Sequence, residues 1–305
     1  MSDNFHIPVL SHEAVELLIN NDLKKKTYVD GTLGAGGYTR LICENTNDSD
    51  KVIAIDKDLN AISFAEKDLE FCANKLTILH GNFGEVKKLL IEIGTNSISG
   101  IVLDLGLSSF QLEHEEGFSY MRDTQLDMRA SKEETLTATD VINEYDAKSL
   151  EKIFEEYGDL GKARRLVTAI IAARRKKIIE TTFELVEVVE NEYKLGRKNR
   201  MDFLSKIFQA LRIEVNSEMK NLANVLEQSL ELTESGGRIV VVSYHSLEDR
   251  MVKNFFRDHY YKKQKDNEAG KFLNILTKKP VIPGLQEIKS NRRSRSAKLR
   301  AAQII

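Results

Sequence analysis

The sequence predicts an α/β protein: a doubly wound, mostly parallel sheet that is interrupted by an inserted helical domain. Three observations support this fold class. Short apolar runs alternate with helical patterns in the first third of the chain, as they do in successive βαβ units. Helical patterns alone fill a long middle stretch, and one further strand-like run follows it. An insertion explains that order, because two consecutive domains would leave the late strand with no sheet to join.

The four early strand-like runs are nearly continuous in Val, Ile and Leu, which is typical of parallel strands that helices cover on both faces. They are Thr27–Asp30, Lys51–Asp56, Leu76–His80 and Gly100–Asp104. The helical patterns that follow the first three cover Tyr38–Glu44, Leu59–Cys72 and Phe83–Glu92.

The middle stretch and the return to the sheet set the expected domain limits. Helices are expected at Ala147–Tyr157, Ala163–Arg175, Thr182–Glu192 and Asp202–Val215, and a crossover helix at Asn216–Leu232 leads to the strand Arg238–Ser243. We therefore predict a discontinuous domain of residues 1–114 and 216–305 around a helical domain of residues 115–215. Residues 258–290 are polar and aperiodic, which predicts a loop that is poorly ordered near Lys262–Lys271.

The composition is that of a globular protein, with 305 residues of which 41% are hydrophobic and 30% charged. No apolar run approaches the roughly 20 residues that a membrane helix needs. The N-terminus lacks the basic start and apolar stretch of a signal peptide. The two cysteines, Cys43 and Cys72, indicate neither a disulfide framework nor a structural zinc site. These features predict a protein of the reducing cytoplasm.

The formal net charge of −2 conceals an uneven distribution along the chain. Residues 250–305 carry 15 Lys and Arg against 4 Asp and Glu, a balance of +11, so the other 249 residues sum to −13. Such asymmetry indicates a nucleic acid or another acidic partner at one end. A solvated basic tail without a partner is the alternative.

The first strand runs into a glycine-rich turn that precedes a helix. Glycines at this position let backbone N–H groups of a helix N-terminus approach a ligand closely. The dinucleotide fingerprint G-x-G-x-x-G is not met, because Gly34 and Gly36 are followed by Thr39 where the third glycine belongs. The P-loop Lys-Ser/Thr pair is also missing from this turn. The turn therefore predicts a nucleoside site with no phosphate requirement.

Residues at the ends of the next three strands complete this predicted site. Asp56 ends the second strand and can accept both ribose hydroxyls; capping the next helix is its alternative role, which suits Asp58 better. Phe83 follows the third strand and either borders a purine ring or packs in the core. Asp104 ends the fourth strand at the expected switch point, where open α/β sheets bind ligands. Two hydroxyls and an amide follow it, from Ser108, Ser109 and Gln111; turn capping by Asp104 and Ser108 is the alternative.

Eight segments, in order and with matching spacing, resemble one known family. They are DGTLGAGGYTR, IAIDKD, HGNFGEV, LDLGLSSFQL, GFSYMRDTQLDMR, FQALRIEVNSE, GGRIVVVSYHSLEDRMVK and RSAKLRAA. Together, from His6 to Ala302, they are similar to the MraW-type (small-subunit methyltransferase H) family of bacterial 16S ribosomal RNA cytosine N4-methyltransferases. The resemblance implies a class I S-adenosylmethionine-dependent methyltransferase fold with S-adenosylmethionine as cofactor. It also implies 16S rRNA or the small ribosomal subunit as partner and a cytidine of the decoding region as target.

The resemblance assigns cofactor contacts to the positions that match the family's motifs. These are Gly36, Gly37, Tyr38, Asp56, Phe83, Asp104 and Gln111. Only the resemblance selects Tyr38 and Gln111, whereas the pattern of strand ends had already selected the acids. The chain departs from the family at loop sites that usually carry proline, namely Phe110, Thr124-Gln125, Asn199–Met201 and Asn291-Arg292.

Methylation of the exocyclic N4 of cytosine requires help from the enzyme, because the N4 lone pair is delocalised into the ring. Alignment of N4, the methyl carbon and the sulfonium sulfur supplies much of the rate. Acceptors that hold the N4–H groups stabilise the positive charge that develops during attack. Asp104, Ser108 and Ser109 are the candidate catalytic residues. Cys43 and Cys72 lie within helical patterns and are expected in the core, which argues against a covalent adduct with the ring.

Tyr244 and His245 follow the late strand, at the same edge of the sheet as Asp104. The resemblance suggests that they border the target base, with Tyr244 as an aromatic platform and His245 as a polar contact. The alternative is structural: Ser246 caps a helix over residues 247–257, and Tyr244 packs inward. Metal binding by His245 with Glu248 and Asp249 is not expected, because no further ligands converge on them in the sequence.

Two basic segments are expected to neutralise RNA phosphates, so that RNA binding weakens with salt. Residues 162–177 lie on the inserted domain, which we expect to recognise the substrate. Residues 292–300 form the C-terminal cluster, with Arg292, Arg293 and Arg295 as candidate contacts. For the first segment, an amphipathic helix with solvated charges is the alternative.

Two other function classes are compatible with such a fold. A nicotinamide oxidoreductase is disfavoured by the missing third glycine and by the end of the fourth strand. A non-catalytic RNA-binding protein is disfavoured because Asp56, Asp104 and Gln111 are all present.

Overall fold

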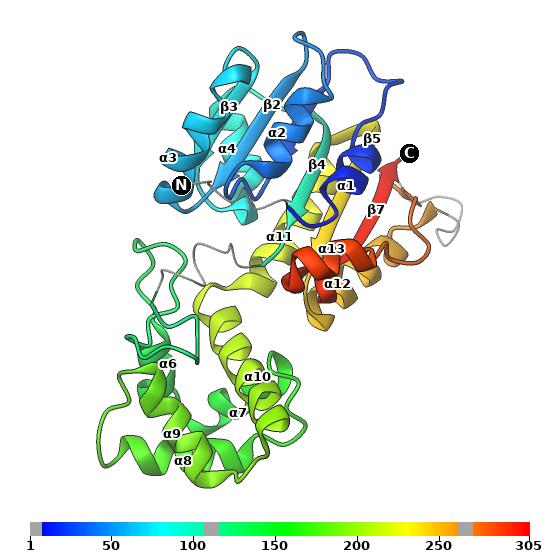
Figure 1. The fold of residues 1–305 in the computed structure, drawn as a ribbon. Coiled ribbons are helices and arrows are strands. Elements are labelled where there is room, and N and C mark those ends of the chain that lie inside the picture. Colours follow the sequence, from blue (N-terminus) through cyan, green and yellow to red (C-terminus); the bar gives the residue numbers. More distant parts are fainter. Residues whose placement is uncertain (1–7, 107–115, 262–270) are drawn as a thin grey trace. The chain divides into compact units, whose positions relative to one another are not determined.

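The chain divides into two compact units, Met1–Gly106 with Lys220–Ile305 and, as the second unit, Leu107–Met219. The computed structural model describes residues 8–106, 116–261 and 271–305 (Figure 1). In that part of the chain, no helix combines the length and the apolar character needed to cross a bilayer.

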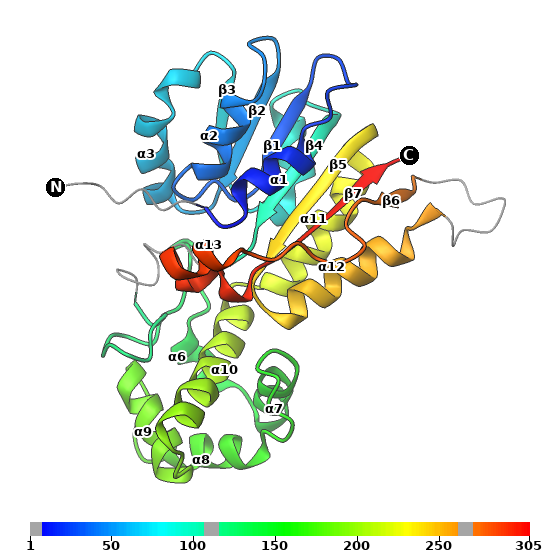
Figure 2. The same cartoon turned by 45° about the vertical axis from the view of Figure 1, so that its right-hand side comes forward.

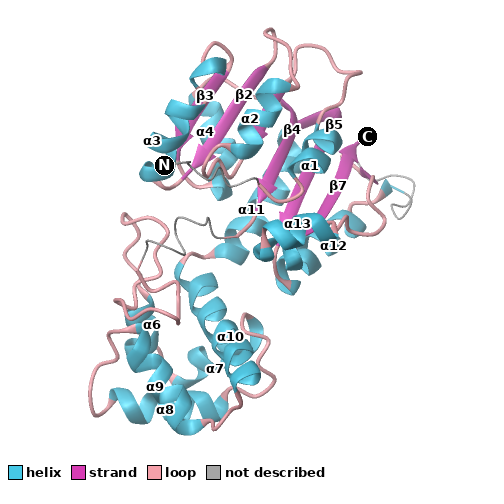
Figure 3. Ribbon diagram, viewed as in Figure 1, coloured by secondary structure: helices cyan, strands magenta, loops and turns pink. Residues whose placement is uncertain are grey.

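The first unit is built on a seven-stranded sheet with the order β3-β2-β1-β4-β5-β7-β6, which the labels of Figure 2 follow, and Figure 3 draws its strands in magenta. The strands are β1 (Thr27–Asp30), β2 (Lys51–Asp56), β3 (Leu76–His80), β4 (Ile98–Asp104), β5 (Thr233–Ser243), β6 (Leu273–Ile275) and β7 (Lys298–Ile304). The first five pair in parallel, whereas β7 is antiparallel to β5 and to β6. All five predicted strands are present, and the late strand joins the sheet as expected. The predicted doubly wound fold class is confirmed.

Helices cover both faces of this sheet (Figures 1 and 2). On one face, α1 (Ser11–Leu18), α2 (Gly37–Glu44) and α3 (Leu59–Asp68) share an apolar cluster with strand residues such as Val52, Val102 and Val240. On the other face, α4 (Val86–Glu92) packs beside α11 (Glu218–Leu232), where the Lys87 N–H donates to Gln228 Oε1 at 2.8 Å. The helices α12 (Ser246–Asp258) and α13 (Leu285–Ser290) follow β5 and precede β7.

The prediction of a loop over residues 258–290 is wrong for part of that range. Strand β6 and helix α13 lie within it, and β7 occupies the end of the basic C-terminal cluster. These short elements are stabilised by contacts distant in sequence: Asn274 in β6 pairs with Gln303 in β7, and Leu273 is fully buried. Most of the stretch predicted to be poorly ordered, residues 262–270, lies outside the described residues.

The second unit has its own hydrophobic core, formed by five helices and the loops beside them. The helices are α6 (Ala138–Glu144), α7 (Ala147–Glu156), α8 (Arg164–Arg174), α9 (Thr182–Glu192) and α10 (Arg197–Val215). Capping boxes at Thr137 and Thr181 fix the starts of α6 and α9. The sequence predicted four of these helices and missed α6. The predicted limits, a discontinuous domain of residues 1–114 and 216–305 around a helical domain of residues 115–215, stay a prediction.

Candidate functional site

Three neighbouring parallel strands end in aspartates at one edge of the sheet. β2, β1 and β4 end at Asp56, Asp30 and Asp104. The strand order reverses between β1 and β4, which is where open α/β sheets bind ligands. Asp30 is fully buried, and the other two are half-buried. The sequence analysis did not select Asp30, although an aspartate at the end of each apolar run could have revealed it.

Asp30 and Asp56 hold the glycine-rich turn in shape. Asp30 accepts the Thr32 N–H at 3.0 Å and the Thr39 hydroxyl at 2.7 Å. Asp56 Oδ2 accepts the Gly34 N–H at 2.8 Å, and Gly34 has a φ of 49°, which favours glycine. The pKa of Asp30 is raised to about 6: burial is the largest cause, the two hydrogen bonds lower it, and the charge of Asp56 raises it. The turn is therefore fixed by carboxylates of two adjacent strands.

Asp58, and not Asp56, caps α3, as the sequence predicted. The Asp58 side chain accepts the Asn60 N–H at 2.9 Å. Asp56 Oδ1 accepts the Asp58 N–H at 2.9 Å, so both of its carboxylate oxygens bind backbone. Burial raises the pKa of Asp56 in spite of these bonds. Its role as the ribose acceptor stays a prediction.

Gly36, Gly37 and Tyr38, which the resemblance assigns to the cofactor, lie at the start of α2 and pack against neighbouring residues of the protein. A Cβ on Gly37 would lie 2.7 Å from Pro8 Cγ, and a Cβ on Gly36 would lie 3.1 Å from a methyl group of Leu69. Tyr38 is buried, and its hydroxyl donates to the Val9 carbonyl. Contact with a cofactor would therefore come from the backbone N–H groups of the first helical turn, which lack intrahelical acceptors.

Phe83 lies beside the same turn and is half-buried. It begins the 3-10 helix Phe83–Glu85, and a Cβ placed on Gly31 would lie 3.5 Å from the Phe83 Cβ. The contact of Phe83 with a purine ring stays a prediction. Three other predicted residues, Ser108, Ser109 and Gln111, lie outside the described residues.

Asp104 is held from both sides at the end of β4. Its N–H donates to Thr32 Oγ1 at 2.7 Å, and its carboxylate Oδ1 accepts the Tyr244 hydroxyl at 2.8 Å. The pKa of Asp104 is raised to about 8: burial is the largest cause, the Tyr244 hydrogen bond lowers it, and the charges of Asp30 and Glu248 raise it. The switch point therefore places an acid with a raised pKa among other carboxyls, an environment that favours a cationic ligand.

Tyr244 combines features of the two alternatives considered for it. Its ring is half-buried against the core of the first unit, and its hydroxyl reaches Asp104. A Cβ on Gly106, which has a φ of 129°, would lie 3.0 Å from the Tyr244 ring, so that only glycine fits here without displacement. Tyr244 is thus placed by packing to orient a strand-end acid; its contact with a target base stays a prediction.

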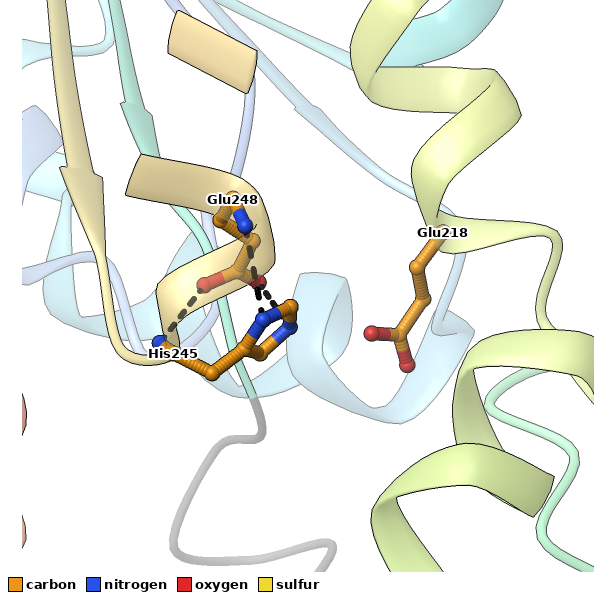
Figure 4. Close-up of side chains that lie close together, drawn as sticks. All are labelled: Glu218, His245 and Glu248. Atoms are coloured by element: carbon orange, nitrogen blue, oxygen red, sulfur yellow. Dashed lines mark hydrogen bonds and ion pairs between the residues drawn. The ribbon is translucent and has the colours of Figure 1, made fainter. Parts of the chain in front are cut away.

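The expectation that Ser246 caps the helix after β5 is wrong. The helix α12 begins at Ser246, and His245 is its cap: His245 Nδ1 accepts the Glu248 N–H at 3.4 Å. The Glu248 carboxylate in turn accepts the N–H groups of Tyr244 at 2.8 Å and His245 at 3.2 Å. Figure 4 shows the His245 ring turned toward this carboxylate, which is only 3% exposed. The H-x-x-E spacing was the sequence signal for Glu248, which the sequence analysis missed as a support of Tyr244.

A cavity of about 290 Å³ opens beside Tyr244 in the first unit. Its lining comes from three segments: residues 244–246, the chain around α13 and residues 295–298. It brings together three predicted substrate residues, Tyr244, His245 and Arg295. Arg292 and Arg293, two others, are exposed on the 3-10 helix Arg292–Ser296, which also carries Arg295.

Only part of the C-terminal basic cluster is available to RNA. Arg300 is only 8% exposed, and its Nε donates to Asp249 Oδ1 at 2.6 Å. Lys298 Nζ donates to the other oxygen of Asp249 at 3.0 Å. Arg300, which ends the predicted cluster of residues 292–300, is therefore engaged in an internal ion pair with Asp249.

The basic segment 162–177 of the second unit is also partly engaged in internal contacts. Arg174 donates to the carbonyls of Ile142 and Tyr145, so it ties α8 to α6. Arg165 and Lys177 pair with glutamates of α9. The remaining cations of the segment, Lys162, Arg164, Arg175 and Lys176, are exposed. Within residues 162–177, these four side chains remain as candidate phosphate contacts.

Comparison with known proteins identifies a family over nearly the whole chain. The model of the MraW methylase family matches residues 3–305. Ribosomal RNA small subunit methyltransferase H of Caldicellulosiruptor bescii is 44% identical over 306 residues, covering 98% of each chain. The proteins of the same name from Persephonella marina and Fusobacterium nucleatum are 42% and 38% identical, covering 98% and 100% of this chain and 99% and 98% of their own.

Proposed function

The chain belongs to the MraW methylase family, and from that premise we propose that it transfers the methyl group of S-adenosylmethionine to N4 of one cytidine in the decoding region of 16S rRNA. The names of its relatives support small-subunit ribosomal RNA as the substrate. The choice of N4 and of the decoding region derives from the resemblance of its motifs. The observation that carries the chemistry is Asp104, bound by the Tyr244 hydroxyl at the switch point of the sheet.

S-adenosylmethionine is the cofactor of this methylase, and the described residues fit it. The N–H groups at the start of α2 suit the carboxylate of its amino acid part. Asp56 suits the ribose hydroxyls, and the strand-end acids suit the positive charges of its sulfonium and ammonium groups. When bound, the cofactor supplies the electrophilic methyl group. We assign Gly36, Gly37, Tyr38, Phe83 and Gln111 to the same site by the match of their motifs.

Asp104 is proposed to act on the amino group of the target base. In its ionised form it accepts an N4–H hydrogen bond, which orients the nitrogen lone pair and stabilises the positive charge that forms on N4. Tyr244 holds the carboxylate in one orientation, so that alignment costs little at the moment of transfer. Ser108 and Ser109 are proposed as further acceptors. Cys43 and Cys72 are both buried, as predicted, which disfavours a route through a cysteine adduct.

Recognition of the RNA is assigned to the basic surfaces and to the helical unit. We propose that Tyr244, His245, Arg292, Arg293 and Arg295 contact the substrate near the base. The helical unit, with the exposed cations of residues 162–177, is proposed to bind other phosphates of the RNA. Ribosomal subunits are assembled in the cytoplasm, so we assign the activity to that compartment.

The test is transfer of label from tritiated S-adenosylmethionine to 16S rRNA or to small ribosomal subunits from a bacterial strain that lacks the endogenous enzyme. We expect one N4-methylcytidine per RNA, identified by mass spectrometry of the digested product. Label at a different atom of cytosine would overturn the N4 assignment. RNA binding without methyl transfer to either substrate would favour the non-catalytic RNA-binding alternative. In a separate assay, reduction of a nicotinamide cofactor would favour an oxidoreductase.

A further inference from the structure

The cavity beside Tyr244 is the strongest unassigned feature of the first unit. It has an apolar wall and a basic rim: Ile282, Pro283 and Ile288 form the wall, and Arg295 lies on the rim. Ile282 is 66% exposed, so its side chain is accessible to a ligand in the cavity. None of the strand-end aspartates lines the cavity.

The walls of this cavity are fixed by hydrogen bonds between distant segments. Val281 and Leu299 exchange two backbone hydrogen bonds, at 2.9 and 3.0 Å, which seats the Ile282 loop on β7. The Glu287 carboxylate accepts the Leu10 N–H at 2.8 Å, which holds α13 against the start of α1. A cavity bounded in this way is already formed before a ligand arrives, so binding there costs little ordering entropy.

We infer that this cavity binds a second nucleotide of the substrate RNA, adjoining the one that is methylated. This inference rests on the proposed function. A nucleobase has an apolar face that matches Ile282 and Pro283, and its phosphate matches the guanidinium of Arg295. About 290 Å³ lies just under the 300–1,000 Å³ that drug-sized ligands fill, so it suits one nucleotide.

The lining also argues that this nucleotide is not the methylated one. Tyr244 lines the cavity and donates its hydroxyl to Asp104, which is not a lining residue. Tyr244 therefore adjoins both the cavity and Asp104. Neighbouring nucleotides of an extended strand would occupy the two sides of Tyr244, so that binding one nucleotide positions the other for transfer.

Two pairs of variants test this inference, each pairing a lining residue with a neighbour outside the cavity. Ile282→Ser is matched by Leu285→Ser, which changes a residue that is 78% exposed and does not line the cavity. Arg295→Ala is matched by Lys289→Ala, which removes an exposed cation of α13 that also lies outside the lining. All four changes are at the surface or the rim, and thermal unfolding checks that each variant is folded.

The first readout is the affinity for a fluorescently labelled RNA fragment of the decoding region, measured by anisotropy. We expect Ile282→Ser to weaken RNA binding about tenfold, which corresponds to about 1.4 kcal/mol, with an unchanged affinity for S-adenosylmethionine. Leu285→Ser should stay within about twofold of wild type, since it removes no contact to a base in the cavity. Equal losses in the two serine variants would overturn the inference.

The second readout is the salt dependence of the same affinity. Loss of one phosphate contact lowers the slope of log K against log salt by about 0.7 for a single strand. We expect that change for Arg295→Ala and none for Lys289→Ala; equal slopes would show that no phosphate sits at the cavity rim. Both readouts are independent of turnover. If wild type binds through the cavity but transfers no methyl group, the proposed function fails, and what stands is a nucleotide site in the cavity.

Discussion

Replacing Asp104 with asparagine should make the protein more stable while it abolishes methyl transfer. The pKa of Asp104 is raised to about 8 from an ordinary 3.8, with burial as the largest cause. A carboxylic acid with a raised pKa binds its proton more tightly in the folded chain than in the unfolded chain. Its ionisation therefore lowers the stability of the fold as the pH rises from about 4 to about 8. Asparagine keeps the oxygen that accepts the Tyr244 hydroxyl and carries no charge.

The magnitude follows from that pKa. Between about pH 4 and pH 8, the wild type loses about 1.4 kcal/mol of unfolding free energy per pH unit from this group. At pH 7 the advantage of Asp104→Asn reaches about 4 kcal/mol. This value is an upper limit, because solvent reaches part of the Asp104 side chain. Other titrating groups are shared by the two proteins and largely cancel in the difference.

The assay is equilibrium urea unfolding of both proteins at pH 5, 6 and 7, with Asp22→Asn, a change at an exposed residue, as the control. The free-energy difference between variant and wild type should grow with pH, and the control should show no such growth. A difference that is constant with pH would refute the electrostatic reasoning. Methyl transfer measured on the same proteins should disappear in Asp104→Asn and persist in the control; retained turnover would refute the assigned role.

Three further changes probe the supports of the site. Asp56→Ala removes the acceptor of two backbone N–H groups, so we expect calorimetry to show at least tenfold weaker binding of S-adenosylmethionine. Gly37→Ala places a methyl group against Pro8 and should lower stability by about 1–3 kcal/mol in urea unfolding. Asp249→Ala leaves Arg300 buried without its partner and should cost about 3–5 kcal/mol at pH 7. Because the pKa of Asp249 is lowered, that loss should shrink as the pH falls below about 4, the ordinary value of a free aspartate.

The parallel strands could be predicted from the sequence because their apolar runs are determined locally. A run such as KVIAID is buried on both faces whatever its partners are, and it therefore stands out against polar flanks. Strand β7 offers no such signal, since Lys298 and Arg300 alternate with small and apolar residues. It is a strand because it pairs with β5 and β6, which are distant in sequence. Short edge elements of this kind depend on tertiary pairing more than on intrinsic propensity.

The site shows the same division between local and distant causes. Asp56 and Asp104 could be predicted because each ends an apolar run. The hydrogen bond from Tyr244 to Asp104 joins residues 140 positions apart, and no spacing in the sequence indicates it. Arg300 was counted in the basic C-terminal cluster by its charge, and its buried partner, Asp249, lies 51 positions earlier. Charged residues can be counted in a sequence, but whether a charged side chain is free to bind RNA depends on contacts that only the fold supplies.

The uneven charge of the chain follows from two ligands with opposite requirements. The pKa values of Asp30, Asp56 and Asp104 are raised, mainly because these strand-end carboxyls are buried, and the charges of nearby acids add to the effect. A sulfonium cation would favour their ionised forms, whereas an RNA phosphate at the same place would disfavour them. The phosphates of the substrate must therefore be bound elsewhere, while only its neutral base approaches the acids. Tyr244 lies at this boundary, because its hydroxyl binds Asp104 and its ring borders the cavity that carries Arg295. An acidic body and a basic C-terminal segment are thus what a methylase needs when its donor is a cation and its acceptor belongs to a polyanion.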